Sequence, residues 1–484
     1  MNMMYQSTRN KEEQVTASQA ILKGLASDGG LFVPVDIPKV DIKEVGFFNQ
    51  TYQELAYKIM QPFLSDFTEE ELKECINRAY DDKFTNEKIA PLRKVGEDYY
   101  LELYHGSTLA FKDMALSILP YLMTTAVKKQ KIDNEIVILT ATSGDTGKAA
   151  MEGFSDVEGT KIIVFYPKDG VSDIQEKQMV TQKGNNTFVV GINGNFDDAQ
   201  KAVKDMFEND KLNKELASKN KQFSSANSIN IGRLVPQIVY YFYAYQQLIE
   251  SKEISLGELI NVSVPTGNFG NILAAFYAKQ MGLPIDYLIC ASNKNNVLTD
   301  FFSSGHYSRN RDFYVTNSPS MDILVSSNLE RLLYEITNKD ANRLSRLMTD
   351  LKQRGEYSLD PVEFKRLDGF FAGFTEEEKI ETIVKAVFEQ TKEVIDPHTA
   401  VAKKVADEFD KNQNKTVIVS TASPFKFPRV FTGKVEAGSE IKALHEISQL
   451  PIPKVISELE DLEIRHHHVV ELSEMEDKVL EFLR

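Results

Sequence analysis

The sequence predicts an α/β protein built on two parallel β-sheets. Three apolar runs, at 135–140 (EIVILT), 161–166 (KIIVFY) and 187–192 (TFVVGI), are typical of buried strands, and helical segments at 148–154 and 173–183 lie between them. A second set of runs follows at 259–264 (LINVSV), 285–290 (IDYLIC) and 416–420 (TVIVS). Strands that are apolar along their whole length and are separated by helices indicate a parallel sheet covered on both faces. Two such units, one nested inside the other, account for both sets.

Length and composition set the broad class. A chain of 484 residues exceeds what one hydrophobic core normally serves, so we expect two or three domains. With 42% hydrophobic and 26% charged residues, the chain has the composition of a soluble protein. Its net charge of −15 argues against nucleic acid and anionic membranes as partners, but not against a small anionic ligand in a local positive pocket.

The same inventory bears on location. Two cysteines, Cys75 and Cys290, are too few for a disulfide framework and suit a reducing compartment. No run approaches the roughly 18 apolar residues that a membrane span needs. Residues 1–14 lack the apolar segment of a secretory signal. We therefore expect a cytoplasmic protein, monomeric or homodimeric.

Domain boundaries follow from the pattern of elements. Residues 1–97 are expected to be mainly helical, because 51–63 has helical apolar spacing and a capping residue with an acidic first turn at 66–72 (DFTEEEL) precedes a helix through Ala79. The smaller, nested α/β domain is expected at 118–219, and the larger one at 98–117 and 220–484. Charged amphipathic helices, such as 329–336 and 341–354, predict a helical insertion at about 318–392 with no strand beside it.

The C-terminal stretch 457–478 is charged and is expected to be a solvated tail. It contains three consecutive histidines at 466–468. We expect no metal site there, because consecutive side chains point in different directions on any regular element.

One stretch carries the first candidate catalytic residue. Residues 105–113 (HGSTLAFKD) follow a strand-like alternation at 99–104 and precede an apolar helical run at 114–119. Lys112 therefore lies near a helix start, where the helix dipole disfavours a cation. A lysine held there in a pocket of low polarity is poised to act as an amine nucleophile. On these residues alone, a solvated surface lysine is the commoner interpretation.

Three loops of small residues follow strands, the position at which open parallel sheets bind ligands. Residues 141–147 (ATSGDTG) and 265–271 (PTGNFGN) each lead into a helix, so backbone N–H groups and the helix dipole favour a carboxylate or phosphate. Gly267 and Gly270 would let the backbone approach an anion closely. Helix capping with tight packing explains the first loop equally well, and 265–271 has neither the dinucleotide-binding nor the Walker spacing. The third loop is 420–427 (STASPFKF).

Two further stretches bear on the substrate. Residues 225–233 (SANSINIGR) end in an arginine, and the planar fork of Arg233 suits bidentate recognition of a phosphate. A surface ion pair is the alternative for this side chain. Residues 396–401 (DPHTAV) predict only a turn that leads into a helix.

These motifs, in this order, resemble those of the threonine synthases, pyridoxal-phosphate enzymes of fold type II. Residues 105–113 resemble the family's His-Gly-Pro-Thr-x-x-Phe-Lys-Asp signature, with Ser107 in place of proline. The 265–271 loop is similar to the Gly-Asn-x-Gly-Asn cradle, and 420–427 to Thr-Ala-His-Pro-x-Lys-Phe, with Ser423 in place of histidine. Residues 27–34, 141–147, 225–233 and 396–401 also resemble family segments, so the resemblance runs from about residue 24 to 428.

The resemblance implies a tryptophan synthase β-like fold whose larger domain binds pyridoxal 5'-phosphate. Lys112 would carry the cofactor as a Schiff base and serve as the catalytic base. The implied cofactor-binding residues are Lys112, Asp145, Gly267, Asn268, Phe269, Gly270, Asn271 and Thr421, with Asp145 beside the ring hydroxyl and Thr421 facing the ring nitrogen. The implied substrate-binding residues are Thr142, Ser143, Thr146, Asn230 and Arg233.

The implied reaction converts O-phospho-L-homoserine and water to L-threonine and phosphate, which makes the protein a phosphate-releasing lyase of threonine biosynthesis. Lys112 would remove the α-proton, phosphate would leave the γ-carbon, and water would add at the β-carbon. Three alternatives stay open. An O-phosphothreonine phospho-lyase would use the same fold. A threonine or serine dehydratase needs no phosphate pocket, so Arg233 argues against it, and a silent binding protein would be expected to have lost Lys112. The synthase is the function we predict.

Overall fold

The computed structural model describes residues 3–142, 144–169, 171, 173–436 and 438–484. Within these ranges the larger sheet contains β4 (Leu92–Val95), β5 (Asp98–Glu102), β10 (Ile260–Pro265), β11 (Ile285–Ser292), β14 (Phe370–Phe374) and β15 (Thr416–Ser420). Its order is β14-β11-β10-β15-β5-β4, and every neighbouring pair is parallel except β4 with β5. The strands predicted at 259–264, 285–290 and 416–420 are confirmed.

The smaller sheet is parallel throughout. It contains β6 (Glu135–Ala141), β7 (Thr160–Pro167), β8 (Thr187–Asn193), β9 (Lys221–Ser224) and β16 (His468–Glu471), in the order β16-β8-β7-β6-β9. The three predicted strands, now β6, β7 and β8, are confirmed. The sequence-based boundary at 220 placed β9 in the larger domain, but β9 pairs with β6, so the smaller sheet extends a few residues beyond that boundary.

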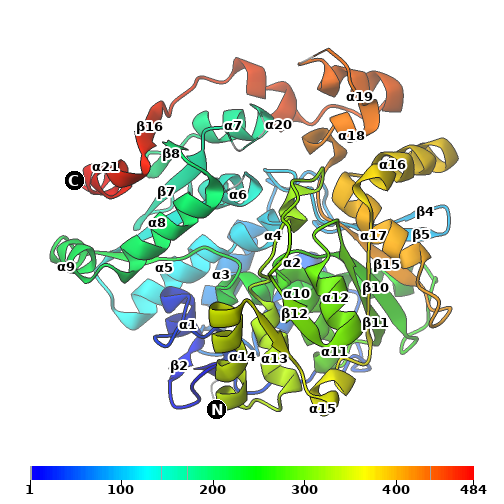
Figure 1. Ribbon diagram of the computed structural model, residues 1–484. Helices are drawn as coiled ribbons and strands as arrows, with labels where there is room; N and C mark the ends of the chain where they lie inside the picture. The colour runs from blue at the N-terminus through cyan, green and yellow to red at the C-terminus, as the bar shows by residue number, and fades with distance from the viewer. Residues whose placement is uncertain (1–2, 143, 170, 172, 437) are drawn as a thin grey trace.

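Helices pack on both sheets (Figure 1). The helices α4 (Asp113–Leu116) and α5 (Leu119–Gln130) precede the first strand of the smaller sheet, β6. The helices that lie between the strands of this sheet along the chain are α6 (Asp145–Phe154), α7 (Asp173–Val180), α8 (Phe196–Glu208) and α9 (Asp210–Ser218). With the larger sheet are α10 (Ile231–Glu250), α11 (Gly270–Met281), α12 (Val297–Ser304) and α17 (Pro397–Asp407). Among the described residues, no helix is long and apolar enough to cross a membrane.

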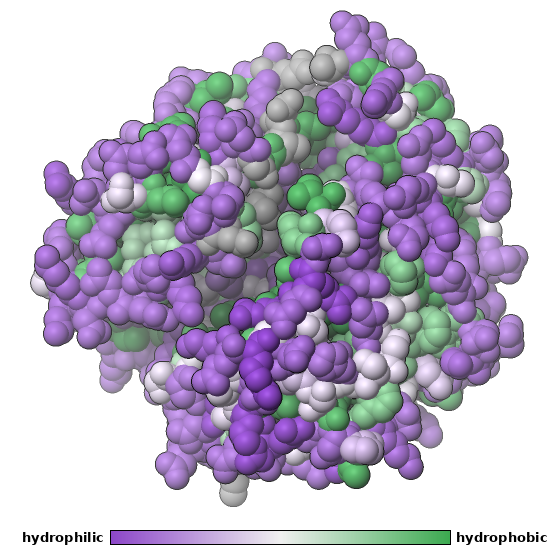
Figure 2. All heavy atoms as spheres, in the orientation of Figure 1, coloured by the Kyte–Doolittle hydropathy of each residue, from purple (hydrophilic) through white to green (hydrophobic). Residues whose placement is uncertain are grey.

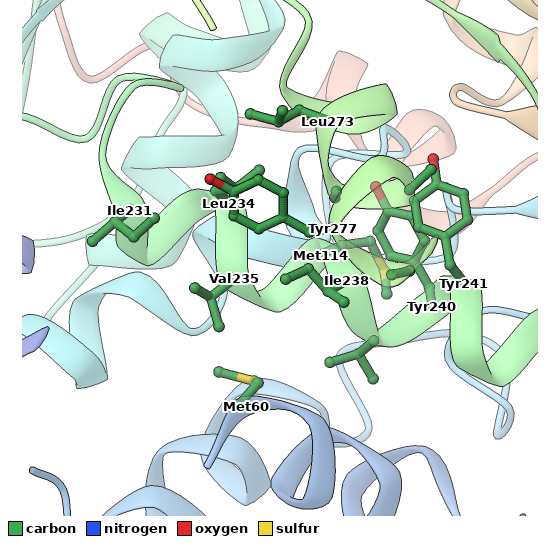
Figure 3. Close-up of a cluster of buried hydrophobic side chains, with 14 of the residues drawn as sticks. Met60, Met114, Ile231, Leu234, Val235, Ile238, Tyr240, Tyr241, Leu273 and Tyr277 are labelled. Atoms are coloured by element: carbon green, nitrogen blue, oxygen red, sulfur yellow. The ribbon is translucent and has the colours of Figure 1, made fainter. Parts of the chain in front are cut away.

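The core is centred on α10. All residues from Ile231 to Leu248 are buried, and most of them are apolar or aromatic, so the helix is enclosed on every side. Figure 3 shows Leu234, Val235 and Ile238 of this helix packed among Met60 of α2 (Tyr52–Met60) and side chains of α11. This packing joins the N-terminal region to the larger sheet.

The N-terminal region is only partly as predicted. The helices expected at 51–63 and 66–79 are confirmed as α2 and α3 (Glu69–Ala79), and Thr68 caps α3 through a capping box with Glu71. The prediction missed an antiparallel sheet of β1 (Met4–Ser7), β2 (Gln14–Thr16) and β3 (Phe32–Pro34), which stands beside α1 (Ala17–Lys23). These strands are three or four residues long, which is too short for a periodic signal.

The insertion is helical, but the expectation that no strand lies beside it is wrong. Its helices are α13 (Leu329–Ile336), α14 (Ala341–Arg354), α15 (Pro361–Lys365) and α16 (Glu377–Thr391), preceded by the short turn η1 (Pro319–Met321). Between them β14 adds an edge strand to the larger sheet by pairing with β11, and β13 (Glu356–Ser358) pairs with β12 (His306–Ser308). The run at β14 (FFAGF) is short and only half-buried, so neither its length nor its alternation marked it as a strand.

The C-terminal stretch is not the solvated tail that the charge pattern predicted. After η2 (Pro424–Lys426), α18 (Arg429–Thr432), α19 (Glu440–Ser448), α20 (Lys454–Ser457) and η3 (Leu459–Asp461), the chain returns to the smaller unit (Figure 1). There β16 pairs in parallel with β8, and η4 (Leu472–Glu474) leads into α21 (Met475–Phe482). Val470, Met475 and Val479 join the apolar core of the smaller sheet. The stretch is charged because its other side chains face solvent.

Candidate active site

A cavity of about 460 Å³ is lined by residues of both sheet units. The loops after β6, β10 and β15 all reach it, so it lies at the carboxyl ends of the strands, as expected for an open parallel sheet. Hydrophilic side chains dominate the face of the molecule drawn in Figure 2, and this face is hollowed near its middle. The predicted site residues that line the cavity are Lys112, Thr142, Asp145, Thr146, Arg233, Gly267, Asn268, Phe269, Gly270, Asn271 and Thr421.

Lys112 occupies the position that the sequence predicted, immediately before the short helix α4. Its Nζ donates a hydrogen bond of 3.4 Å to the hydroxyl of Ser320. Burial lowers the pKa of the amine to about 8; Asp145 opposes this shift, and the positive charges of Lys426 and Arg233 add to it. A large fraction of Lys112 is therefore neutral at mildly alkaline pH, as a nucleophilic or basic amine must be.

The loop around Lys112 is held by its own residues. The backbone N–H and the hydroxyl of Thr108 donate to the two carboxylate oxygens of Asp113, at 2.8 and 2.6 Å. Gly106 packs so closely on that carboxylate that a Cβ would lie 2.5 Å from it. The N–H of Phe111 donates to the carbonyl of Thr421 at 2.8 Å, which ties the loop to the end of β15. The loop that carries Lys112 is thus anchored to the larger sheet at the end of β15.

The 141–147 loop ends in a buried ion pair. The Thr142 hydroxyl accepts hydrogen bonds from the N–H groups of Gly144 and Gly147, so it organises the loop. Asp145, at the first position of α6, pairs with Lys426 at 2.6 Å. Burial raises the pKa of Asp145, but Lys426 and Lys112 outweigh it and hold the pKa well below its usual range. The predicted substrate residue Ser143 lies outside the described residues.

The 265–271 loop is shaped to approach a ligand closely. Phe269 adopts a left-handed backbone (φ +67°) just before α11, and no side chain caps this helix start. At Gly267 a Cβ would lie 2.6 Å from the carbonyl oxygen of Ser320, so the position admits only glycine. The Oδ1 of Asn271 accepts a hydrogen bond from Tyr240 at 2.8 Å and another from Tyr241, while its Nδ2 is buried without a partner among the described residues. An uncapped helix start and an unpaired amide suit an anion.

The two predicted residues of 225–233 behave differently. Asn230 does not line the cavity: its Oδ1 accepts from Gly232 N–H, and its amide donates to the carbonyls of Ile21 and Ser225, so it caps α10. Arg233 does line the cavity and is only 3% exposed. Its Nη1 donates to the carbonyl of Ala226 at 3.1 Å, and its Nε has no partner among the described residues. Burial lowers the pKa of Arg233 to about 10.

Sequence reasoning missed several groups of the site. Lys426 is fully buried, pairs with Asp145 and donates to the carbonyl of Thr108 at 2.9 Å. His398 and Ser320 line the cavity. Lys426 and His398 lie in the stretches 420–427 and 396–401, which the sequence analysis examined. Neither residue has neighbours in the sequence that indicate a buried side chain. Ser320 lies in the insertion, far from any motif.

Comparisons with known proteins agree with this geometry. Residues 4–80 match the family model described as threonine synthase N terminus. Threonine synthase from Pseudomonas aeruginosa is 37% identical over 88% of this chain and 89% of its own length. Threonine synthase-like 1 from Homo sapiens is 40% identical over 86% of this chain, which spans 58% of the length of that relative.

Solved structures give the same result. The crystal structure of a pyridoxal-phosphate-bound threonine synthase from Brucella melitensis superposes with a TM-score of 0.89 at 34% identity and covers 100% of both chains. Threonine synthase from yeast gives a TM-score of 0.88 at 30% identity over 99% of this chain and 98% of that one. Identity of 30% or more across almost the whole chain places it in one family with these proteins. The chain belongs to the threonine synthase family.

Proposed function

We propose that this protein is a pyridoxal-phosphate-dependent threonine synthase that converts O-phospho-L-homoserine and water to L-threonine and phosphate. The observation that carries the proposal is that one cavity holds an amine of lowered pKa, Lys112, and two separate groups suited to phosphate. One is the loop at the start of α11, and the other is the guanidinium of Arg233, whose Nε has no partner among the described residues. A cofactor phosphate and a substrate phosphate need two such places.

The residues present fit the cofactor. Lys112 would hold it covalently, and the backbone N–H groups of 267–271 with the unpaired amide of Asn271 would hold its phosphate. Thr421 would face the ring nitrogen, and Asp145 would lie beside the ring hydroxyl. When bound, the cofactor supplies an electron sink that delocalises the negative charge left when the α-proton is removed.

The chain's own groups then divide the remaining work. Lys112 would be the base for the α-proton, and its lowered pKa leaves a large fraction of its amine unprotonated at mildly alkaline pH. Arg233 orients the substrate phosphate so that it leaves from the γ-carbon. Thr142 keeps the first loop in shape, and the hydroxyl of Thr146 faces the same cavity as a contact for substrate or water.

The charge of Arg233 supports an anionic substrate. Lys112 and Arg233 line the cavity together with the carboxylates of Asp145 and Asp322, and Asp145 is already paired with Lys426. Among the described residues no carboxylate pairs with Arg233. A substrate without a phosphate would leave this buried guanidinium without a charged partner, which argues against a dehydratase.

Product identification tests the proposal. The purified protein, loaded with pyridoxal phosphate, is incubated separately with O-phospho-L-homoserine, O-phospho-L-threonine and L-threonine, and the products are identified by mass spectrometry. We expect L-threonine and phosphate in equal amounts from the first substrate only, and no product with Lys112→Ala. Phosphate released from O-phospho-L-threonine but not from O-phospho-L-homoserine would instead make the protein a phospho-lyase.

A further inference from the structure

His398 is a buried side chain of the cavity that the steps above leave without a role. It is 2% exposed and stands in the first turn of α17. Its Nδ1 lies 2.8 Å from Oδ1 of Asp396, a buried carboxylate that also accepts hydrogen bonds from the N–H of His398 and the hydroxyl of Thr399. Because a carboxylate only accepts, Nδ1 carries the proton in the neutral ring, and the lone pair is on Nε2.

Nε2 points toward the turn that also contacts Lys112. It accepts the N–H of Ser320 at 3.3 Å, and the hydroxyl of the same serine accepts from Lys112 at 3.4 Å. Both distances exceed the usual 2.9–3.0 Å, so neither contact holds its group tightly. The ring of Phe427 lies edge-on to the imidazole, with the two ring centroids 5.0 Å apart. Lys112 and His398 thus face one cavity from either side of Ser320.

The proposed reaction needs a second base. Lys112 becomes protonated when it takes the α-proton, so it cannot also take a proton from the water that attacks the β-carbon. We propose that His398 is that second base, a step that rests on the proposed function. This step follows the departure of phosphate and the transfer of a proton from the β-carbon to the γ-carbon, which becomes a methyl group. An O–H bond of the water breaks and its proton goes to Nε2, while the oxygen forms the bond to the β-carbon. The electron pair of the carbon–carbon double bond moves to the α-carbon, where protonated Lys112 returns a proton.

Asp396 would act through His398 as a positioning residue. It holds the ring with Nε2 unprotonated before the step and stabilises the imidazolium that forms during it. The imidazolium afterwards releases its proton to the free phosphate or to solvent, which restores the neutral ring. Asp396 also accepts the N–H at the start of α17, so its asparagine variant keeps an oxygen for that cap.

The test measures the ratio of threonine to 2-oxobutanoate that the variant His398→Gln forms for each phosphate released. If hydration is slow, the unsaturated four-carbon amino acid left after phosphate departs is released, and with water it gives 2-oxobutanoate and ammonia. We expect phosphate release within about threefold of the wild type. The yield of threonine per phosphate should fall about 100-fold, since general base catalysis contributes at least that much. 2-Oxobutanoate should account for the difference.

Asp396→Asn provides a second variant, and Phe427→Leu a packing control. Asp396→Asn should also shift products toward 2-oxobutanoate and should move the acidic limb of the pH profile of threonine formation. Phe427→Leu should leave the product ratio unchanged. The proposal is overturned if His398→Gln lowers threonine and phosphate together at an unchanged ratio, or, should that variant lose the cofactor colour, if Asp396→Asn does so. Failure of the wild type to release phosphate from O-phospho-L-homoserine would instead overturn the proposed function.

Discussion

Replacing Arg233 with methionine separates the contribution of this side chain to function from its contribution to stability. In the wild type the guanidinium is buried, its Nη1 makes one hydrogen bond to a carbonyl, and its Nε makes none among the described residues. No carboxylate within the described ranges forms an ion pair with it. The free side of the fork can therefore offer two parallel N–H groups to a phosphate of the substrate.

The magnitude follows from these two bonds. A hydrogen bond to a charged group contributes about 1.5–3 kcal/mol, so losing a bidentate pair should reduce substrate binding and transition-state stabilisation by about 3–6 kcal/mol. At 1.4 kcal/mol per tenfold change, Arg233→Met should lower kcat/KM about 10²- to 10⁴-fold. Arg233→Lys should recover only part of the loss, because an ammonium cannot make both bonds.

Stability should respond in the opposite way. Removing a buried charge that lacks a charged partner relieves a desolvation penalty, which offsets the loss of the one hydrogen bond to the carbonyl of Ala226. Arg233→Met should therefore unfold at about the same temperature as the wild type or higher. Arg331 is the matched control, because it is equally buried but donates to the carbonyls of Phe32 and Ile229 and to the side chain of Asn328. Arg331→Met leaves those acceptors unpaired, at about 1–3 kcal/mol each, and should unfold at a clearly lower temperature.

Steady-state kinetics with O-phospho-L-homoserine, competition by inorganic phosphate and thermal unfolding check all three expectations. Phosphate should inhibit the wild type competitively and the methionine variant much less. An Arg233→Met protein that keeps its kcat/KM and its inhibition by phosphate would refute the reasoning. So would a loss of stability as large as that of the Arg331 variant, because it would show that Arg233 is a structural residue.

Three further predictions follow from the packing around the cavity. Lys426→Met should raise the pKa of Lys112 above about 8, because a neighbouring positive charge is lost, whereas Lys426→Arg should leave that pKa unchanged. The pH dependence of Lys112 acylation in the apo-protein measures the pKa, and equal pKa values in the wild type and both variants would contradict the prediction. Gly267→Ala should abolish cofactor binding because its Cβ would lie 2.6 Å from a backbone oxygen, while Gly270→Ala, with its nearest neighbour at 3.6 Å, should weaken it far less, as measured by titration of the apo-protein. Val470→Asp should lower the free energy of unfolding by about 2 kcal/mol or more in a denaturant titration, because the side chain is only 9% exposed; the same change at the exposed valine just before it should have little effect.

Much of the framework could be predicted from the sequence because its signals are local. A continuous apolar run predicts each of the strands β6, β7, β8, β10, β11 and β15. The loops of small residues that follow β6, β10 and β15 are predicted to lie at the carboxyl ends of the strands, where open parallel sheets bind ligands. Lys112 could be placed before a helix from its neighbours alone. The resemblance of the loop motifs to threonine synthase segments implied a shared cofactor and substrate site, and eleven of the residues it implied line the cavity.

Other features depend on contacts between residues far apart in the chain. β16 is a strand because it pairs with β8. Its four residues are too few to show a periodic pattern in the sequence. The chemistry of its side chain made Arg233 a candidate, and the family resemblance added Asn230, but the structure directs Asn230 to backbone groups and Arg233 to the cavity.

The electrostatics of the site was decided by the tertiary structure alone. Lys426 contacts Asp145 and Thr108, and His398 lines the cavity, although these residues are far apart in the sequence. The apolar pattern and the loop motifs therefore determined which elements form and where a ligand can bind. The tertiary structure decided the pKa of Lys112 and the pairing of the buried charges, because desolvation and Coulomb interaction depend on distances in space rather than along the chain.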